Sequence, residues 1–239
     1  MKLWKSWVIA TKDFNIFLKK KRILYTLIIL PLLISVGLPV MLSSMDNPIE
    51  IITLLDAFSY FYIILAIIQS STLASYSILG EKIEQSLEPL LATPITDGEL
   101  LLGKTISSFL PCIGVIYVCS LIFMVLSDAV TYNTLGYLFF PNLKMAFILL
   151  LAVPLSSILS IQLNVIISAR VNDVRTANQL GLLLEIPFIG VYILLVTNIA
   201  TLNVINVLAI IAALILTDLA FFYLNKSTFQ RDNILTKWK

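Results

Sequence analysis

Histidine is absent from this sequence, cysteine occurs twice, and charged residues make up only 13% of the 239 positions. Without histidine the chain can build neither a Ser-His-Asp triad nor a Cys-His nucleophile pair. Cys112 and Cys119 stand seven residues apart on one predicted helix face, but two thiols without further ligands do not make a zinc site. We expect both to pack among apolar side chains. Because a soluble domain carries about 25% charged residues, the low charge also argues against a soluble protein.

Apolar residues make up the majority of the chain. They make up 59% of the chain, and the mean hydropathy is +0.98. A bilayer core about 30 Å thick needs roughly 20 helical residues per crossing, and the alternating strand pattern of a membrane barrel does not occur. The sequence therefore predicts an all-α integral membrane protein, with one domain over residues 1–239 and six transmembrane helices. The apolar runs are 23–42, 51–79, 105–126, 146–167, 180–197 and 204–224.

The cations are distributed unevenly between the two sides that these spans define. If the N-terminus lies inside, every Lys and Arg except Lys144 falls in a cytoplasmic segment, including the tail over 226–239. The positive-inside rule then predicts cytoplasmic N- and C-termini in the plasma membrane, and an even number of spans agrees with it. The outer segments are too short for a folded ectodomain, so we expect the helices themselves to meet any substrate.

Residues 1–22 form a predicted amphipathic helix ahead of the first span. Tryptophans and other large apolar residues recur at helical spacing, while Lys5, Lys12 and Lys19 follow every seven residues on another stripe. Tryptophan favours the depth of the lipid headgroups and lysine reaches anionic lipid, so this helix is expected to lie in the inner interface. It serves either as an anchor alone or as an anchor that also docks a partner.

Residues 80–104 form the only long charged island inside the chain. The second apolar run is long enough to leave the bilayer, and an apolar stripe continues from it beside an acidic face. Pro94 limits this helix, and Thr96 with Glu99 matches a capping box that starts a new helix near residue 97. The pattern predicts either a helical coupling elbow in the cytoplasm or a solvated loop helix. The acidic face consists of Glu81, Glu84 and Glu88.

A phosphate-loop pattern, G-x-x-x-x-G-K-[ST], occurs in the same segment at Gly98, Gly103, Lys104 and Thr105. The residues between the two glycines are helix formers, and Pro94 stands where the pattern needs a buried strand. We therefore interpret the match as coincidental and expect no nucleotide site in this chain.

Polar side chains inside the predicted spans are expensive in lipid and are therefore candidates for function. Glu185 stands out because it lies two residues before Pro187, whose missing N–H predicts a bend. It contacts either a substrate or gate, or a neighbouring helix. Asp218, near the inner end of its span, is expected to reach water. We take Gln69, Glu185, Asp56 and Gln162 as candidates for a translocation pathway, and note Asn164 as a further polar residue of the spans.

The charged island resembles the signature loop of ABC-2 type transporter permeases, the membrane subunits of type V ABC exporters. Six spans, cytoplasmic termini, the N-terminal helix and a short polar loop with Arg170, Asp173 and Arg175 agree with this resemblance. Pro89 departs from the family pattern. The residues that resemble the loop are Glu81, Lys82, Ser86, Leu87, Glu88, Leu90, Leu91, Thr93, Pro94, Thr96, Glu99, Gly103 and Lys104.

The resemblance implies that the chain is the permease subunit of an ATP-driven exporter. It would form the translocation pathway with a second permease subunit, bind no cofactor itself, and dock on a separate ATP-binding cassette subunit that holds ATP and Mg²⁺. Membrane lipid is a further expected partner, and nucleic acid is not. The implied interface with the ATP-binding subunit comprises Glu81, Glu84, Glu88, Leu90, Leu91, Thr93, Pro94, Thr96, Glu99, Lys104, Arg170, Asp173 and Arg175.

The residues alone leave open a second class of function, a secondary transporter or channel subunit that needs no ATPase. Against it, the two halves of the sequence show no inverted repeat and no paired helix breaks at corresponding positions. An intramembrane enzyme is a weaker third reading, because the sequence shows no nucleophile-base pair and no set of metal ligands.

Overall fold

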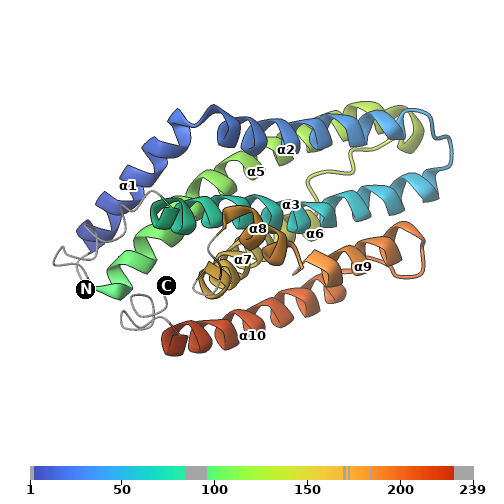
Figure 1. Ribbon diagram of the computed structural model, residues 1–239. Coiled ribbons are helices and arrows are strands. Elements are labelled where there is room, and N and C mark those ends of the chain that lie inside the picture. Colours follow the sequence, from blue (N-terminus) through green and yellow to red (C-terminus); the bar gives the residue numbers. More distant parts are fainter. Residues whose placement is uncertain (1–2, 84–95, 169–170, 172, 184, 229–239) are drawn as a thin grey trace.

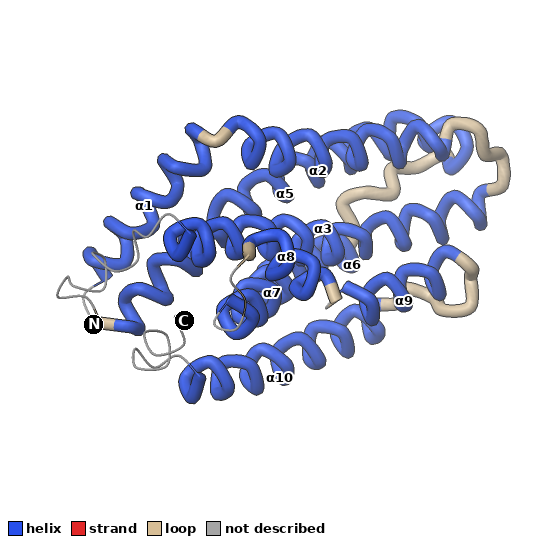
Figure 2. Tube along the Cα trace, viewed as in Figure 1, coloured by secondary structure: helices blue, strands red, loops and turns tan. Residues whose placement is uncertain are grey.

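The described part of the chain consists of helices and the loops between them, without a strand (Figure 2). The computed structural model describes residues 3–83, 96–168, 171, 173–183 and 185–228. The predicted all-α fold is confirmed. The helices are α1 (Leu3–Lys19), α2 (Lys21–Leu42), α3 (Pro48–Ile83), α5 (Asp97–Leu135), α6 (Leu143–Phe147), the π-helix η1 (Ile148–Ala152), α7 (Val153–Ser168), α8 (Val174–Leu182), α9 (Glu185–Val196) and α10 (Val204–Thr228).

Five stretches of the described chain are long and apolar enough to cross a bilayer, namely α2, α3, α5, the run from α6 to α7, and α10. A sixth crossing results if the bent pair of α8 and α9 is counted as one span. The prediction of a multi-pass helical membrane protein is therefore confirmed. The start of α1 and the end of α10 lie at the same end of the bundle (Figure 1), in agreement with two termini on one side of the membrane.

The central helix of the bundle is α3, which packs against α5, α7, α8 and α9. Its sequence explains this position, because apolar residues occupy all its faces and serines interrupt them without adding bulk. Leu55, Tyr62 and Leu65 are fully buried there. The helix α2 runs along α5 on one side of α3, and α10 packs on α7 on the other (Figure 1).

Both α3 and α5 are longer than a bilayer crossing requires. Their 36 and 39 residues correspond to about 54 and 58 Å of helix, against a hydrocarbon core of about 30 Å. The end of α3 and the start of α5 lie together at the end of the bundle where α1 begins (Figure 1). Each helix is therefore longer than the hydrocarbon core, so part of it extends beyond the core.

The N-terminal helix α1 is amphipathic, as predicted, and packs on the bundle. Its face with Ile9, Asp13 and Phe17 is buried, and its neighbours are α5 and α2. On other faces Trp4 and Lys12 are exposed. The helix ends at the junction with α2, where the chain changes direction (Figure 1).

Two prolines interrupt regular helix inside the bundle. Pro187 lacks an N–H and its ring conflicts with the carbonyl of Leu183, where the chain breaks between α8 and α9. A bend of 41° separates α8 from α9 ahead of Pro187, so the run expected over 180–197 is divided between two helices. Pro154 has no N–H to donate to Leu149 across the wide turn of η1, and the Tyr117 hydroxyl donates to that carbonyl at 3.0 Å instead.

Candidate functional site

A buried ion pair joins α1 to α5 near the end of the bundle where α3 stops and α5 begins. Lys104 Nζ lies 3.7 Å from Asp13 Oδ2 and donates a hydrogen bond to the Ser77 carbonyl oxygen at 2.6 Å. The Ser77 and Ser107 hydroxyls donate to the same Asp13 oxygen at 2.6 and 3.3 Å. The side chains of Lys104 and Asp13 are only 4% and 3% exposed. We call Asp13, Ser77, Lys104 and Ser107 the inner junction.

The inner junction satisfies the charges that it buries. A buried ion pair is favourable only if further hydrogen bonds complete its geometry, and here two hydroxyls and one backbone carbonyl do so. Breaking such a pair from one side costs about 3–5 kcal/mol, because the remaining charge stays buried alone. The junction therefore holds α1, α3 and α5 in one relative position.

Gly103, the residue before Lys104, allows α1 and α5 to approach each other closely. A Cβ atom at this position would lie 2.8 Å from the Ser6 carbonyl oxygen and 2.8 Å from Ile9 Cβ. Real Cβ atoms do not come that near to backbone, so a larger residue would push α1 away from α5. The glycine and the ion pair thus maintain the same helix contact.

This geometry explains the phosphate-loop pattern in structural terms. Gly103, Lys104 and Thr105 lie within the continuous helix α5, whereas phosphate binding requires a loop whose backbone N–H groups are free. The Lys104 side chain is occupied in the inner junction, and the Thr105 hydroxyl donates to the Leu101 carbonyl oxygen at 2.8 Å. The arrangement agrees with a coincidental match.

The capping box predicted at the start of α5 is confirmed. The Thr96 hydroxyl accepts from the Glu99 N–H at 3.3 Å, and Glu99 Oε2 accepts from the Thr96 N–H at 3.1 Å. Glu99 is buried while making this cap. Two of the free N–H groups at the helix start are thereby satisfied, so the chain enters α5 at a defined point.

Most of the predicted interface with an ATP-binding subunit lies outside the described residues. This holds for the whole of Glu84, Glu88, Leu90, Leu91, Thr93, Pro94 and Arg170, and for the side chain of Glu81. Among the described members, Thr96 and Glu99 cap α5, and Lys104 lies in the protein interior, within the inner junction. Glu99 and Lys104 are therefore buried, whereas Thr96 is exposed.

Asp173 and Arg175, the remaining predicted interface residues, lie exposed at the start of α8. Asp173 Oδ2 accepts from the Thr176 hydroxyl at 3.0 Å and from the Thr176 N–H at 3.2 Å, so it is the N-cap of the helix. The hydrogen bond from the Thr176 hydroxyl holds the pKa of Asp173 below its usual value. The carboxylate is therefore charged at neutral pH.

A buried hydrogen-bond network joins α3, α7 and α8. Asn164 donates to Ser71 Oγ at 3.0 Å and accepts from the Ser75 hydroxyl at 2.8 Å. Ser71 in turn donates to Asn178 Oδ1 at 3.3 Å. A Cβ atom at Gly181 would lie 2.5 Å from Ser71 Oγ, so the glycine lets α8 approach α3. Asn164 was a predicted polar residue of the spans. The serines were missed, although their spacing of four residues places them on one helix face.

The candidate pathway residues lie in different surroundings. The Gln69 amide donates to the Thr26 carbonyl oxygen at 3.2 Å and so ties α3 to α2. Gln162 is half-buried on α7. Glu185, 7% exposed at the start of α9, has no partner for Oε1 among the described residues. The expectation that Asp218 reaches water is wrong for the single chain, because α10 packs on α7 and leaves this side chain 8% exposed.

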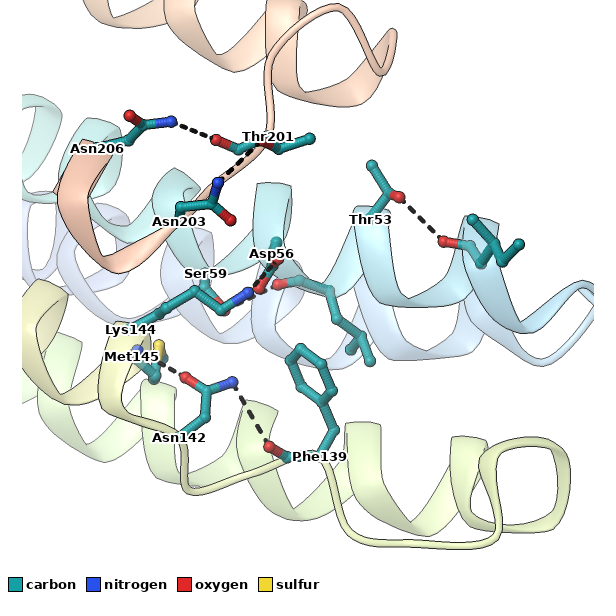
Figure 3. Close-up of polar contacts among 12 residues, drawn as sticks. Thr53, Asp56, Ser59, Phe139, Asn142, Lys144, Met145, Thr201, Asn203 and Asn206 are labelled. Atoms are coloured by element: carbon teal, nitrogen blue, oxygen red, sulfur yellow. Dashed lines mark hydrogen bonds and ion pairs between the residues drawn. The ribbon is translucent and has the colours of Figure 1, made fainter.

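Asp56 pairs with Lys144 near the opposite end of α3 (Figure 3). Lys144 Nζ donates a hydrogen bond to Asp56 Oδ2 and lies 5.9 Å from the centre of the Phe139 ring. Asn142 caps α6 beside it by accepting from the Met145 N–H at 2.7 Å. The Lys144 and Asp56 side chains are 23% and 13% exposed, and Asp56 Oδ1 has no partner among the described residues. We call Asp56 and Lys144 the outer pair.

Residues 7–227 match the family model of the ABC-2 family transporter protein. No curated protein sequence matches significantly. The matched range contains the inner junction, the network around Asn164 and the outer pair, and it extends over almost all of the chain. The resemblance of the chain to ABC-2 type permeases is thereby confirmed. The chain belongs to the ABC-2 family of transporter proteins, as a multi-pass membrane subunit of an ABC transporter.

Proposed function

We propose that this chain is the permease subunit of an ATP-driven exporter, with both termini in the cytoplasm. It forms the translocation pathway with a second permease subunit and docks through residues 80–104 on a separate ATP-binding subunit, which holds ATP and Mg²⁺. Membership of the ABC-2 family supports the transport role. The resemblance of the charged island supports the docking surface, and the direction of transport follows from the same resemblance.

The contacts within the inner junction support the proposal that movement of the docking segment is transmitted to the membrane helices. Residues 84–95 connect the end of α3 with the capping box of α5. Asp13, Ser77 and Lys104 bind those two helices to each other and to α1. A displacement of the segment is therefore passed to three helices together and is not absorbed at a loose helix end.

From the inner junction, α3 leads directly to the polar residues inside the bundle. Ser71 and Ser75 of α3 bond Asn164, and Ser71 also bonds Asn178 of α8. The helix α8 ends at the break before α9, and Glu185 is the first residue of α9. The break between α8 and α9 thus lies next to the Glu185 carboxylate. A shift of α3 against α7 and α8 would therefore move this break. We assign Glu185 the contact with substrate or gate.

Charge reversal at Glu88 tests the docking surface. The variant Glu88→Lys places a cation on the predicted acidic face, and a like-charge contact at an interface costs several kcal/mol, enough to weaken binding by orders of magnitude. An exposed charge contributes under about 1 kcal/mol to folding, so the variant should insert and unfold like the wild type. The measurement is co-purification of the tagged full chain with the ATP-binding subunit, together with the rate of ATP hydrolysis by the complex.

Two variants serve as controls for this experiment. Glu50→Lys makes the same reversal at an exposed position at the other end of α3 and should keep partner binding. Glu185→Gln should keep docking and alter only steps inside the membrane. If Glu88→Lys retains full partner binding and ATP hydrolysis, the segment is only a linker and the proposal is wrong in its docking surface.

A further inference from the structure

An apolar groove opens between α1, α2 and α5, directly beside the inner junction. Its volume of about 540 Å³ lies within the range of roughly 300–1,000 Å³ that small-molecule sites occupy. Along α5 its wall runs from Ile106 to Val115, about 13 Å of helix. The walls include Trp7, Phe14 and Leu18 of α1, Leu24 and Ile28 of α2, and Leu110 and Gly114 of α5.

The hydroxyl groups that line the groove are already hydrogen-bonded within the chain. Its two hydroxyl-bearing residues are Thr11 and Ser107. The Thr11 hydroxyl donates to the Trp7 carbonyl oxygen at 2.9 Å, and the Ser107 hydroxyl lies within hydrogen-bond distance of the Lys104 carbonyl oxygen and of Asp13. Both hydroxyls are therefore used within the chain. Walls of this composition favour an apolar occupant.

The charges around the groove indicate which apolar molecule enters it. Lys19 and Lys21 are exposed at the junction of α1 and α2, between the groove residues Leu18 and Leu24. Trp7, also in the wall, favours the depth of the lipid headgroups. Two exposed cations therefore stand beside the groove, where α1 passes into α2.

We propose that the groove binds one acyl chain of an anionic phospholipid, whose headgroup lies at Lys19 and Lys21, from the leaflet in which α1 lies. Ser107 both lines the groove and bonds Asp13, so the bound chain fills the space next to the inner junction and holds α1 against α5. This inference concerns the membrane domain alone and does not depend on an ATP-binding partner.

Filling the groove from Gly114 tests the proposal. A Cβ atom at Gly114 meets nothing within 4 Å, so the ring of Gly114→Phe enters open space in the groove. Gly37→Phe is the matched control, because Gly37 also has nothing within 4 Å and lies on α2 outside the groove. Phenylalanine is a better helix former than glycine, so neither variant should fail to fold for reasons of helix propensity.

The full chain is incorporated into nanodiscs with phosphatidylglycerol that carries a photoactivatable diazirine in its acyl chain, and labelled peptides are identified by mass spectrometry. We expect labelling over residues 7–18 and 106–115 in the wild type and in Gly37→Phe. Gly114→Phe should lower it roughly tenfold, because excluding about two methylenes at about 0.8 kcal/mol each corresponds to that loss of occupancy. Phosphatidylcholine with the same label, or a chain with Lys19→Gln and Lys21→Gln, should give weaker labelling.

Three results would overturn the proposal. Equal labelling of Gly114→Phe and wild type would mean that the lipid lies outside the groove. Equal labelling by phosphatidylglycerol and phosphatidylcholine would remove the role of the two lysines. Formation of a disulfide-linked dimer by Gly114→Cys would show that a second copy of the chain covers the groove.

Discussion

The inner junction and the outer pair are two ion pairs built around the same helix, α3, and they differ in how completely their charges are satisfied. In the inner junction two hydroxyls and a carbonyl complete the bonding of Asp13 and Lys104, and both side chains are almost fully buried. In the outer pair Lys144 is 23% exposed, and one oxygen of Asp56 has no partner in the described part of the chain. The inner pair thus holds its helices in one relative position. In the outer pair, Asp56 can accept a further hydrogen bond and Lys144 is accessible to water.

The helices around the two pairs also differ in length and in how closely they pack. Three long helices meet at the inner junction, and Gly103 brings two of them into backbone contact. The outer pair instead joins α3 to α6, a helix of five residues that continues into the irregular turn of η1. We infer that the first site transmits movement and that the second site tolerates it.

Removal of Lys104 should give the largest effect. The variant Lys104→Met leaves Asp13 in the protein interior without its cationic partner, and we expect the free energy of unfolding to fall by about 3–5 kcal/mol. The double variant with Asp13→Asn should recover most of this loss, because no charge then remains buried. Denaturant unfolding of the purified chain in detergent micelles measures both. A single variant as stable as the wild type would contradict the buried position of the pair.

Gly103→Ala should have an intermediate effect. Its Cβ would lie 2.8 Å from the Ser6 carbonyl oxygen, and overpacking of this kind destabilises a protein by about 1–3 kcal/mol. Gly37→Ala is the matched control in open space, where alanine should stabilise the helix by up to about 1 kcal/mol. The same unfolding measurement separates the two, and a stabilising Gly103→Ala would show that α1 does not pack as closely as described.

The smallest effect is expected at the outer pair. Lys144→Met removes a cation from a pair that is more exposed than the inner one, and because solvent-exposed pairs contribute about 1 kcal/mol or less, we expect a smaller loss than for Lys104→Met. Unfolding of this variant beside Lys104→Met tests the comparison between the two sites directly. If both variants lost a similar free energy of unfolding, the two pairs would stabilise the fold equally and the comparison would be wrong.

Local patterns in the sequence predicted the helices well, and the reason is physical. Apolar runs must be long enough to cross lipid, so their lengths indicated most of the membrane-crossing helices. Helical periodicity identified α1, and the residue types of a capping box placed the start of α5 at Thr96. The missing N–H of Pro187 located the bend, although the helix α8 before it, with polar residues and a short length, was not expected.

Contacts between distant segments were not predictable in this way. Asp56 and Lys144 are 88 residues apart, and one sequence contains no information about which buried charges meet. For the inner junction a partial signal existed, because Asp13 is the only acidic residue in α1, whose other charges are lysines. Lys104 was noticed, but as part of a motif and of a docking surface. Its partner became evident only when α1 was placed against α5.

The role of the inner junction in coupling is tested most directly by ATP hydrolysis in complexes with two double variants. One variant combines Asp13→Asn with Lys104→Met, and the other combines Asp56→Asn with Lys144→Met. Both remove a complete pair, so both should fold and bind the ATP-binding subunit. We predict that hydrolysis falls toward the rate of the isolated ATP-binding subunit in the inner variant and stays at the wild-type rate in the outer variant. Equal, wild-type rates in both intact complexes would contradict the role of the inner junction in coupling.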